Sequence, residues 1–131
     1  MVTSEIHTVN MASGPKLYSF KKNTYYFGAC HILNLSEEQR GKTLKISVDS
    51  GNRPVCWIEL WEGAFDGGDW VKWTTSRGQL AVLRSGDQPQ PDPSITWTIE
   101  PGDYTIYFVA SSKVRETSDE LITYRIEVVD S

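Results

Sequence analysis

The sequence is poor in the residues that build metal and redox sites. Its 131 residues include two cysteines and two histidines, with neither a Cys-x-x-Cys pair nor a Cys/His cluster. This scarcity argues against a structural zinc site. No apolar run approaches the length that a membrane span requires, so we expect no membrane insertion.

The N-terminus lacks the basic start and the apolar stretch of a signal peptide. The sequence therefore fits a cytoplasmic protein, or a secreted one whose export signal has been removed. Cys30 and Cys56 both fall within strand patterns, which favours two buried free thiols. A disulfide between neighbouring strands stays open as the alternative if the protein is exported.

Negative charge is unevenly distributed between the two halves of the chain, whereas positive charge is nearly even. The formal net charge is −4; residues 1–65 carry seven Lys/Arg and six Asp/Glu, whereas residues 66–131 carry six and eleven. Many of these acids fall in expected loops. Because acidic loops repel phosphate, we expect no nucleic-acid partner.

Aromatic residues and strict alternation are what the sequence has in quantity. There are five Trp, six Tyr and four Phe. Before the turn sequence Glu-Pro-Gly-Asp, the apolar residues Ile95, Trp97 and Ile99 alternate with threonines, and after it Tyr104, Ile106, Phe108 and Ala110 occupy alternate positions. Period-two alternation is typical of a half-buried strand, and proline with glycine favours a turn. The segment therefore predicts a β-hairpin.

The rest of the chain repeats this pattern in short pieces. The expected strands are 5–11, 16–20, 25–35, 43–49, 55–61, 70–74, 80–84 and 121–129, with a helical turn at 36–41 and an exposed, stiff proline-rich loop at 85–93. Gly28 within its strand suggests a bulge or a close approach of two backbones. About eight to ten short strands predict one all-β domain spanning 1–131, an antiparallel two-sheet β-sandwich that is jelly-roll-like.

Four segments also carry a family resemblance, namely Leu44–Val48, Trp57–Trp61, Ile99–Phe108 with its Pro-Gly-Asp-Tyr turn, and Tyr124–Val129. Their pattern resembles that of bacterial pre-peptidase C-terminal domains over about the last two thirds of the chain. The resemblance implies a jelly-roll-like sandwich that serves as a binding or accessory module and brings no catalytic residues. The chain departs from the pattern in its proline-rich loop and in lacking an export signal.

One group of aromatic residues is the candidate binding surface. In the expected strand 55–61, Trp57, Glu59 and Trp61 share one face, and Trp70 and Trp73 follow in the next segment. Indole rings spaced along a strand can stack on sugar rings while a carboxylate accepts hydrogen bonds from hydroxyl groups. Coverage of the same tryptophans by loops or by a second subunit is the alternative.

Other polar groups give weaker signals. Asp66 and Asp69 flank two glycines and could hold calcium, although the spacing is not that of an EF-hand. Glu59 with Asp66 or Asp69 could serve as the carboxylate pair of an acid-dependent hydrolase, and the alternative is that these are surface acids. His31 lies mid-strand among apolar residues, which favours a packed histidine.

These observations predict a noncatalytic binding module, with carbohydrate as the ligand of the aromatic face. The alternative is a structural or protein-interaction domain that forms a homodimer through the same surface. The partner is accordingly a glycan or a protein.

Overall fold

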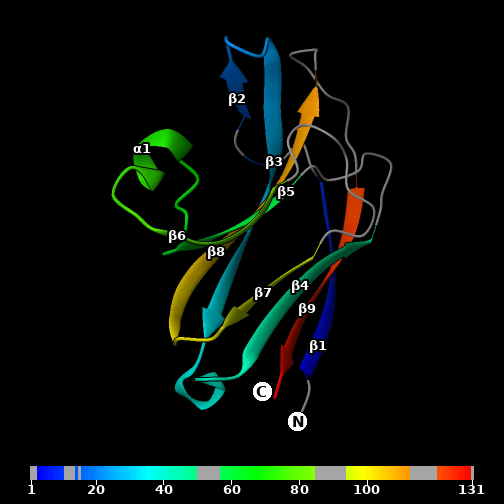
Figure 1. Cartoon of the computed structure of the whole chain (residues 1–131), viewed down its shortest axis with the longest axis vertical. Coiled ribbons are helices and arrows are strands. Elements are labelled where there is room, and N and C mark those ends of the chain that lie inside the picture. Colours follow the sequence, from blue (N-terminus) through cyan, green and yellow to red (C-terminus); the bar gives the residue numbers. More distant parts are fainter. Residues whose placement is uncertain are drawn as a thin grey trace.

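The computed structural model describes residues 3–10, 14, 16–49, 57–84, 94–112 and 121–130. Nearly all of the elements are strands (Figure 1). In chain order they are β1 (Thr3–Asn10), β2 (Lys16–Ser19), β3 (Thr24–Leu35), the 3₁₀ turn η1 (Glu37–Gln39), β4 (Thr43–Asp49), β5 (Trp57–Glu62), α1 (Trp70–Thr74), β6 (Gln79–Arg84), β7 (Ser94–Thr98), β8 (Gly102–Ser112) and β9 (Leu121–Val129). The predicted all-β sandwich is confirmed.

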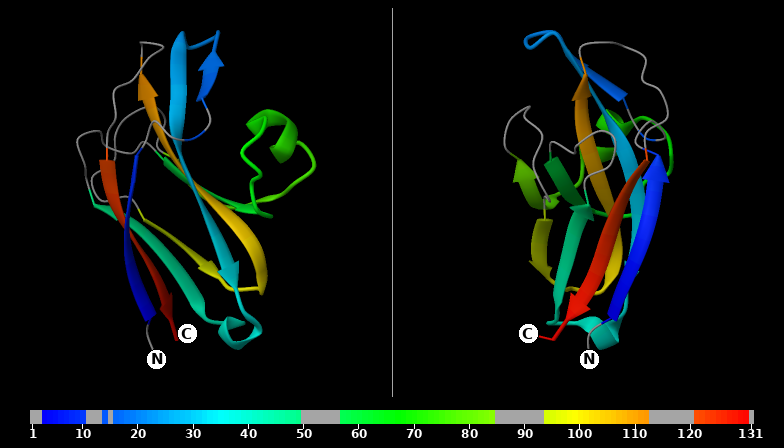
Figure 2. Two further views of the ribbon diagram at one scale, coloured as in Figure 1. Left: turned by 180° about the vertical axis from the view of Figure 1, so that it is seen from behind. Right: turned by 90° about the vertical axis from the view of Figure 1, so that its right-hand side faces the viewer.

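The strands form two antiparallel sheets that pack face to face (Figure 2). One sheet has the order β1-β9-β4-β7 and the other has the order β2-β3-β8-β5-β6. With β2 set aside, the chain crosses between the sheets in the manner of a jelly roll, since β1, β4, β7 and β9 alternate with β3, the pair β5–β6, and β8. Strand β2 is the addition to this plan, and it pairs only with β3 among the described strands.

The core between the sheets follows the predicted alternation. Leu44, Ile46 and Val48 of β4 point inward, and so do the alternate residues Ile122 to Val128 of β9. From the opposite sheet, Ile58, Leu60, Ile106 and Phe108 complete this core. Burial of such side chains is the main source of folding free energy.

The predicted hairpin 95–110 is wrong. Its two strands form as expected, but β7 pairs with β4 in the four-stranded sheet, whereas β8 pairs with β3 and β5 in the other. The Glu100-Pro101-Gly102 turn therefore carries the chain from one sheet to the other. Alternation identifies each strand from its side chains. The same alternation occurs whether the following turn forms a hairpin within one sheet or crosses to the other sheet, so the sequence pattern could not distinguish a hairpin from a crossing.

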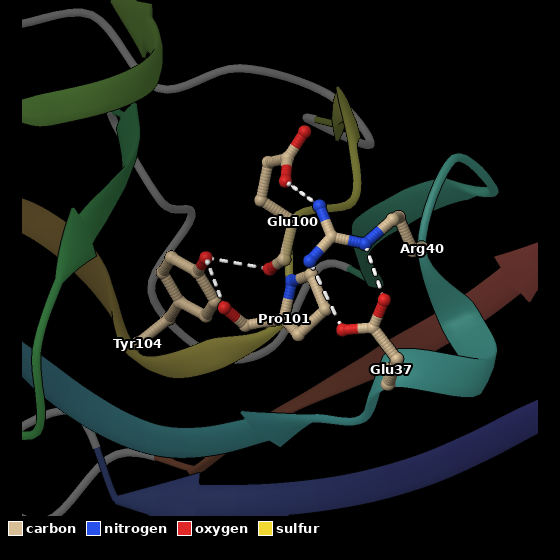
Figure 3. Close-up of polar contacts among 5 residues, drawn as sticks. All are labelled: Glu37, Arg40, Glu100, Pro101 and Tyr104. Atoms are coloured by element: carbon tan, nitrogen blue, oxygen red, sulfur yellow. Dashed lines mark hydrogen bonds and ion pairs between the residues drawn. The ribbon is translucent and has the colours of Figure 1, made fainter.

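This crossing is held by a group of polar contacts at one end of the sandwich (Figure 3). The Tyr104 hydroxyl donates to the Glu100 carbonyl at 2.5 Å, which is the arrangement called a tyrosine corner in other β-sandwiches. The Arg40 guanidinium bonds the Glu37 carboxylate through Nε at 2.6 Å and the Glu100 carboxylate through Nη1 at 2.5 Å. Main-chain bonds from Gly41 to the Ile99 carbonyl (3.0 Å) and from Ile99 to the Lys42 carbonyl (2.9 Å) tie the same regions together.

The helical turn at 36–41 is confirmed as η1. The Gln39 side-chain oxygen accepts a hydrogen bond from the Ser36 backbone at 2.8 Å, as the capping-box spacing predicts. The proline-rich loop 85–93 and Cys56 lie outside the described residues. Within the described ranges, no helix is long and apolar enough to span a bilayer.

The close approach predicted at Gly28 is also confirmed. Gly28 lies opposite Val109, and a Cβ atom at position 28 would lie 1.7 Å from the carbonyl oxygen of Phe108. The Gly28 carbonyl in turn accepts the Gly14 amide at 2.8 Å. No side chain fits between these backbones.

We expect Gly28→Ala to lower the free energy of unfolding by about 1–3 kcal/mol, because the added methyl group must displace strand β8. Gly78→Ala is the matched control, since apart from residue 78 and its two chain neighbours no atom lies within 4 Å of the position that the added methyl group would take. Urea unfolding followed by circular dichroism measures both. Equal stability of the two variants would contradict a close approach at Gly28.

Tyr104→Phe removes the hydroxyl that donates to Glu100, and we expect it to lower stability by about 1 kcal/mol. Arg40→Met should cost less, because its ion pairs lie at the solvent-exposed surface. Denaturant unfolding of both variants checks the order, and a larger loss for Arg40→Met would show that the ion pairs, not the tyrosine corner, hold the crossing.

Candidate functional site

The outer faces of the two sheets differ in chemistry. On the four-stranded sheet, exposed polar residues such as Thr8, Lys45, Thr96 and Arg125 face solvent. On the five-stranded sheet, Tyr107 and Val109 of β8 are as buried as the residues of the opposite, core-facing side. Both faces of β8 are therefore covered.

The cover is the segment 63–78 that connects β5 to β6. Thr105 on β8 fixes its start, donating to the Gly63 carbonyl at 2.7 Å and accepting the Phe65 amide at 2.9 Å. The Asp69 carboxylate then accepts the Lys72 amide at 3.1 Å and begins helix α1. The prediction of a strand at 70–74 is wrong: Asp69 is a favoured N-cap residue, and three-residue spacing places Trp70 and Trp73 on one side of a helix.

We call Trp61, Phe65, Trp70, Trp73 and Tyr107 the tryptophan cluster. Trp70 and Trp73 stack with centroids 5.3 Å apart, and the Trp70 ring lies 4.5 Å from that of Tyr107. Trp61 and Phe65 meet Trp70 edge-on at 5.9 and 5.0 Å. Trp70 is 6% exposed and Trp73 is 7% exposed. The cluster is thus a second, smaller core over the outer face of the sheet, which is the alternative that the sequence left open.

Glu59 lies beside this cluster as a buried acid. Glu59 and Trp61 share one face of β5 as predicted, since the Trp61 indole N–H donates to the Glu59 carboxylate at 3.0 Å. The Gln79 amide donates to the same oxygen at 2.6 Å, and Glu59 is only 6% exposed. Burial, reinforced by the charge of Glu59, raises the pKa of the Cys30 thiol to about 12. The Trp57 side chain lies outside the described part of the structure.

The two loop aspartates make local backbone contacts. Asp66 accepts the Gly68 amide at 2.9 Å, and Asp69 is the cap of α1. Among the described residues, no group of three or more His, Cys, Asp or Glu side chains is placed to hold a metal ion. The carboxylate of Glu59 is buried while Asp66 and Asp69 are exposed.

The two histidines come together although they are far apart in sequence. Their ring centroids lie 4.7 Å apart, and His31 Nδ1 lies 2.5 Å from the Tyr124 hydroxyl. The His7 ring stacks on Tyr124 at 5.3 Å, and its Nε2 atom lies 3.2 Å from the Glu5 carboxylate. These contacts join β1 and β9 of one sheet to β3 of the other, so His31 is packed, as predicted. Burial first, and the neighbouring His7 second, lower the pKa of His31.

One surface feature was missed by the sequence analysis. Phe20, at the turn between β2 and β3, is 89% exposed and is the most exposed of the large hydrophobic side chains described. Its ring contacts Tyr18 edge-on at 4.9 Å, and Tyr18 contacts Tyr25 at 4.4 Å. Lys21 beside it is also exposed. We call Tyr18, Phe20, Lys21, Lys22 and Tyr25 the hairpin tip. The signal was an aromatic residue directly before the turn sequence Lys-Lys-Asn.

No protein-family model matches the sequence, and no curated protein matches it either.

We expect acid to weaken the fold through His31. Since its pKa in the folded state lies below the unfolded value of about 6.5, the unfolded chain binds the proton more tightly, and stability falls as pH drops below about 6.5 until folded His31 is also protonated. Replacing His31 with Gln should reduce this pH dependence. Urea unfolding at a series of pH values tests it, and an unchanged slope in His31→Gln would assign the acid sensitivity to other groups.

Proposed function

We propose that this domain is a noncatalytic binding module whose contact surface is the hairpin tip. The observation that carries the proposal is the exposure of Phe20. A benzyl group in water costs free energy that burial against a partner recovers. One of the two strands of this hairpin, β2, is the strand that is added to the jelly-roll plan.

The exposure of Phe20 is supported by a well-fixed turn. Asn23 adopts a positive φ of 48°, a conformation that asparagine tolerates better than most residues, and the Tyr18 hydroxyl donates to its side chain. The Lys22 amide donates to the Ser19 hydroxyl at 3.3 Å, and the buried Thr24 hydroxyl donates to the Lys22 carbonyl at 2.9 Å. These bonds hold the turn in a shape that presents Phe20 outward.

The tryptophan cluster is less suited to the same task. Carbohydrate stacking and self-association were both expected through open tryptophan faces, yet Trp70 and Trp73 are buried against Tyr107 and Val109 of the five-stranded sheet. The Glu59 carboxylate already accepts two side-chain hydrogen bonds. The aromatic surface of the hairpin tip is therefore more accessible than the tryptophan cluster, both to a glycan and to a second copy of the chain.

A noncatalytic role is supported by the way the candidate acids are used. Glu59 is bonded within the tryptophan cluster, and Asp66 and Asp69 cap backbone turns. A hydrolytic carboxylate pair needs both groups facing one open site. The two exposed aspartates and the buried Glu59 do not offer that arrangement.

Retention on three kinds of surface tests the proposal: arrayed glycans, supported phospholipid bilayers and an immobilised second copy of the chain. We expect the wild-type chain to be retained on at least one of them, and Phe20→Ser to weaken that retention by about tenfold or more. Ile6→Ser is the matched control, because Ile6 is an exposed apolar residue on strand β1. Retention on none, or equal retention of wild type and Phe20→Ser, would overturn the proposal.

A further inference from the structure

We infer that the partner of the hairpin tip is the surface of a phospholipid bilayer that carries anionic headgroups. The inference rests on the proposed function and names the partner of the same surface. It follows from three features of the hairpin: its charge, its aromatic composition and its position in the fold.

The charge of this region is opposite to that of the chain as a whole. The chain has 17 acidic residues and a net charge of −4, yet no Asp or Glu occurs between Glu5 and Glu37. That acid-free stretch contains Lys16, Lys21 and Lys22 and includes all of the β2–β3 hairpin. Lysines near an anionic bilayer each contribute about 1 kcal/mol of attraction. The hairpin therefore lets this acidic protein approach an anionic bilayer, because no carboxylate lies close to the hairpin in the sequence.

The aromatic residues of the hairpin tip suit the boundary between headgroups and acyl chains. Tyr18 and Tyr25 are half-buried, and each combines an apolar ring with a polar hydroxyl. Aromatic rings with a polar end concentrate at this boundary in membrane proteins. Phe20, with no polar atom in its ring, would lie deepest, while the lysine ammonium groups stay at headgroup level.

The position of the hairpin in the fold allows it to contact a flat bilayer surface. The β2–β3 turn lies at the end of the molecule opposite the 3₁₀ turn η1 (Figures 1 and 2). Strand β1 begins and β9 ends at the η1 end, since Thr3 pairs with Val128. Contact through the hairpin therefore leaves the η1 end of the sandwich pointing away from the bilayer.

A bilayer fits the hairpin tip better than a glycan does. A sugar site needs polar side chains beside the ring to bond hydroxyl groups. At the tip, the Asn23 side chain accepts the Tyr18 hydroxyl and the Ser19 hydroxyl accepts the Lys22 amide. These polar groups are used to build the turn, whereas the exposed charges are cationic.

The contact is peripheral. The sequence has no span-length apolar run, and we expected no membrane insertion on that ground. The inference changes that expectation at one position, because the Phe20 ring enters the interfacial region while the sandwich stays in water.

Co-sedimentation with vesicles tests the inference. Vesicles of phosphatidylcholine are compared with vesicles that also contain phosphatidylserine, at low and at high salt. We expect binding to the anionic vesicles, weaker binding to neutral ones, and a loss of binding at about 0.5 M salt because screening shortens the reach of the lysine charges.

Variants of the hairpin tip separate the contribution of the lysine charges to bilayer binding from that of the Phe20 ring. Lys21→Gln and Lys22→Gln should each weaken binding about fivefold, the fold-change that corresponds to about 1 kcal/mol per lysine. Phe20→Ser should weaken it by about tenfold or more, whereas Phe20→Trp should retain it. Lys45→Gln and Ile6→Ser are the controls, since both residues are exposed on the four-stranded sheet.

Two results would overturn the bilayer inference: no binding to anionic vesicles, or binding that Phe20→Ser and the lysine variants leave unchanged. If the wild type then shows Phe20-dependent retention on glycans or on a second copy, the proposed function stands and only the choice of partner is wrong. If no surface shows Phe20-dependent retention, both are wrong. Circular dichroism of each variant excludes unfolding as the cause.

Discussion

Burial of strand β8 on both faces is the constraint on which the rest of the structure depends. All seven residues from Tyr104 to Ala110 are buried, and the strand pairs with β3 on one side and β5 on the other. An antiparallel sheet can leave one face in water. This strand instead has apolar side chains on both faces, so a second layer is needed over Tyr107 and Val109. Segment 63–78 supplies it, and that requirement explains why the tryptophans lie where they do.

The aromatic residues are accordingly divided between two roles. Trp70, Trp73 and Tyr107 stabilise the covered face, and their ring contacts at 4.5–5.3 Å are those of a packed interior. Trp97 contacts Tyr104 at 5.0 Å and joins the end of one sheet to the start of β8 in the other. Among the aromatic side chains that the structure describes, the one most exposed to solvent is Phe20, in the turn that follows β2, and β2 is a strand that the jelly roll does not require. The aromatic residues therefore stabilise the packed interior in one place and form the proposed contact surface in another.

The histidine pair and the Arg40 contacts show two different ways of closing the edges of a sandwich. Arg40 joins η1 to the crossing turn through exposed ion pairs, which contribute modestly. His7, His31 and Tyr124 join the two sheets through partly buried rings. Burial there raises the pKa of Tyr124 to about 12 and lowers that of His31, so acid weakens the histidine contacts. The Arg40 contacts weaken in acid through Glu37, because the hydrogen bond from Arg40 lowers the pKa of that carboxyl. Neither lies at the hairpin tip, which leaves the proposed contact surface independent of both.

The sequence by itself determined most of the strands and their inward faces, because side-chain alternation is a local property; the expected strand at 70–74 is instead helix α1. Thr43–Asp49 and Leu121–Val129 form where alternation predicts them, and Gly28 lies where two backbones approach. Only the tertiary structure decided which strands pair, since the turn after Ile99 looks the same within a sheet and between sheets. It also decided which aromatic residues are covered. The exposure of Phe20 and the burial of Trp70 depend on segments that come from elsewhere in the chain, and no local pattern records which segment lies over which face.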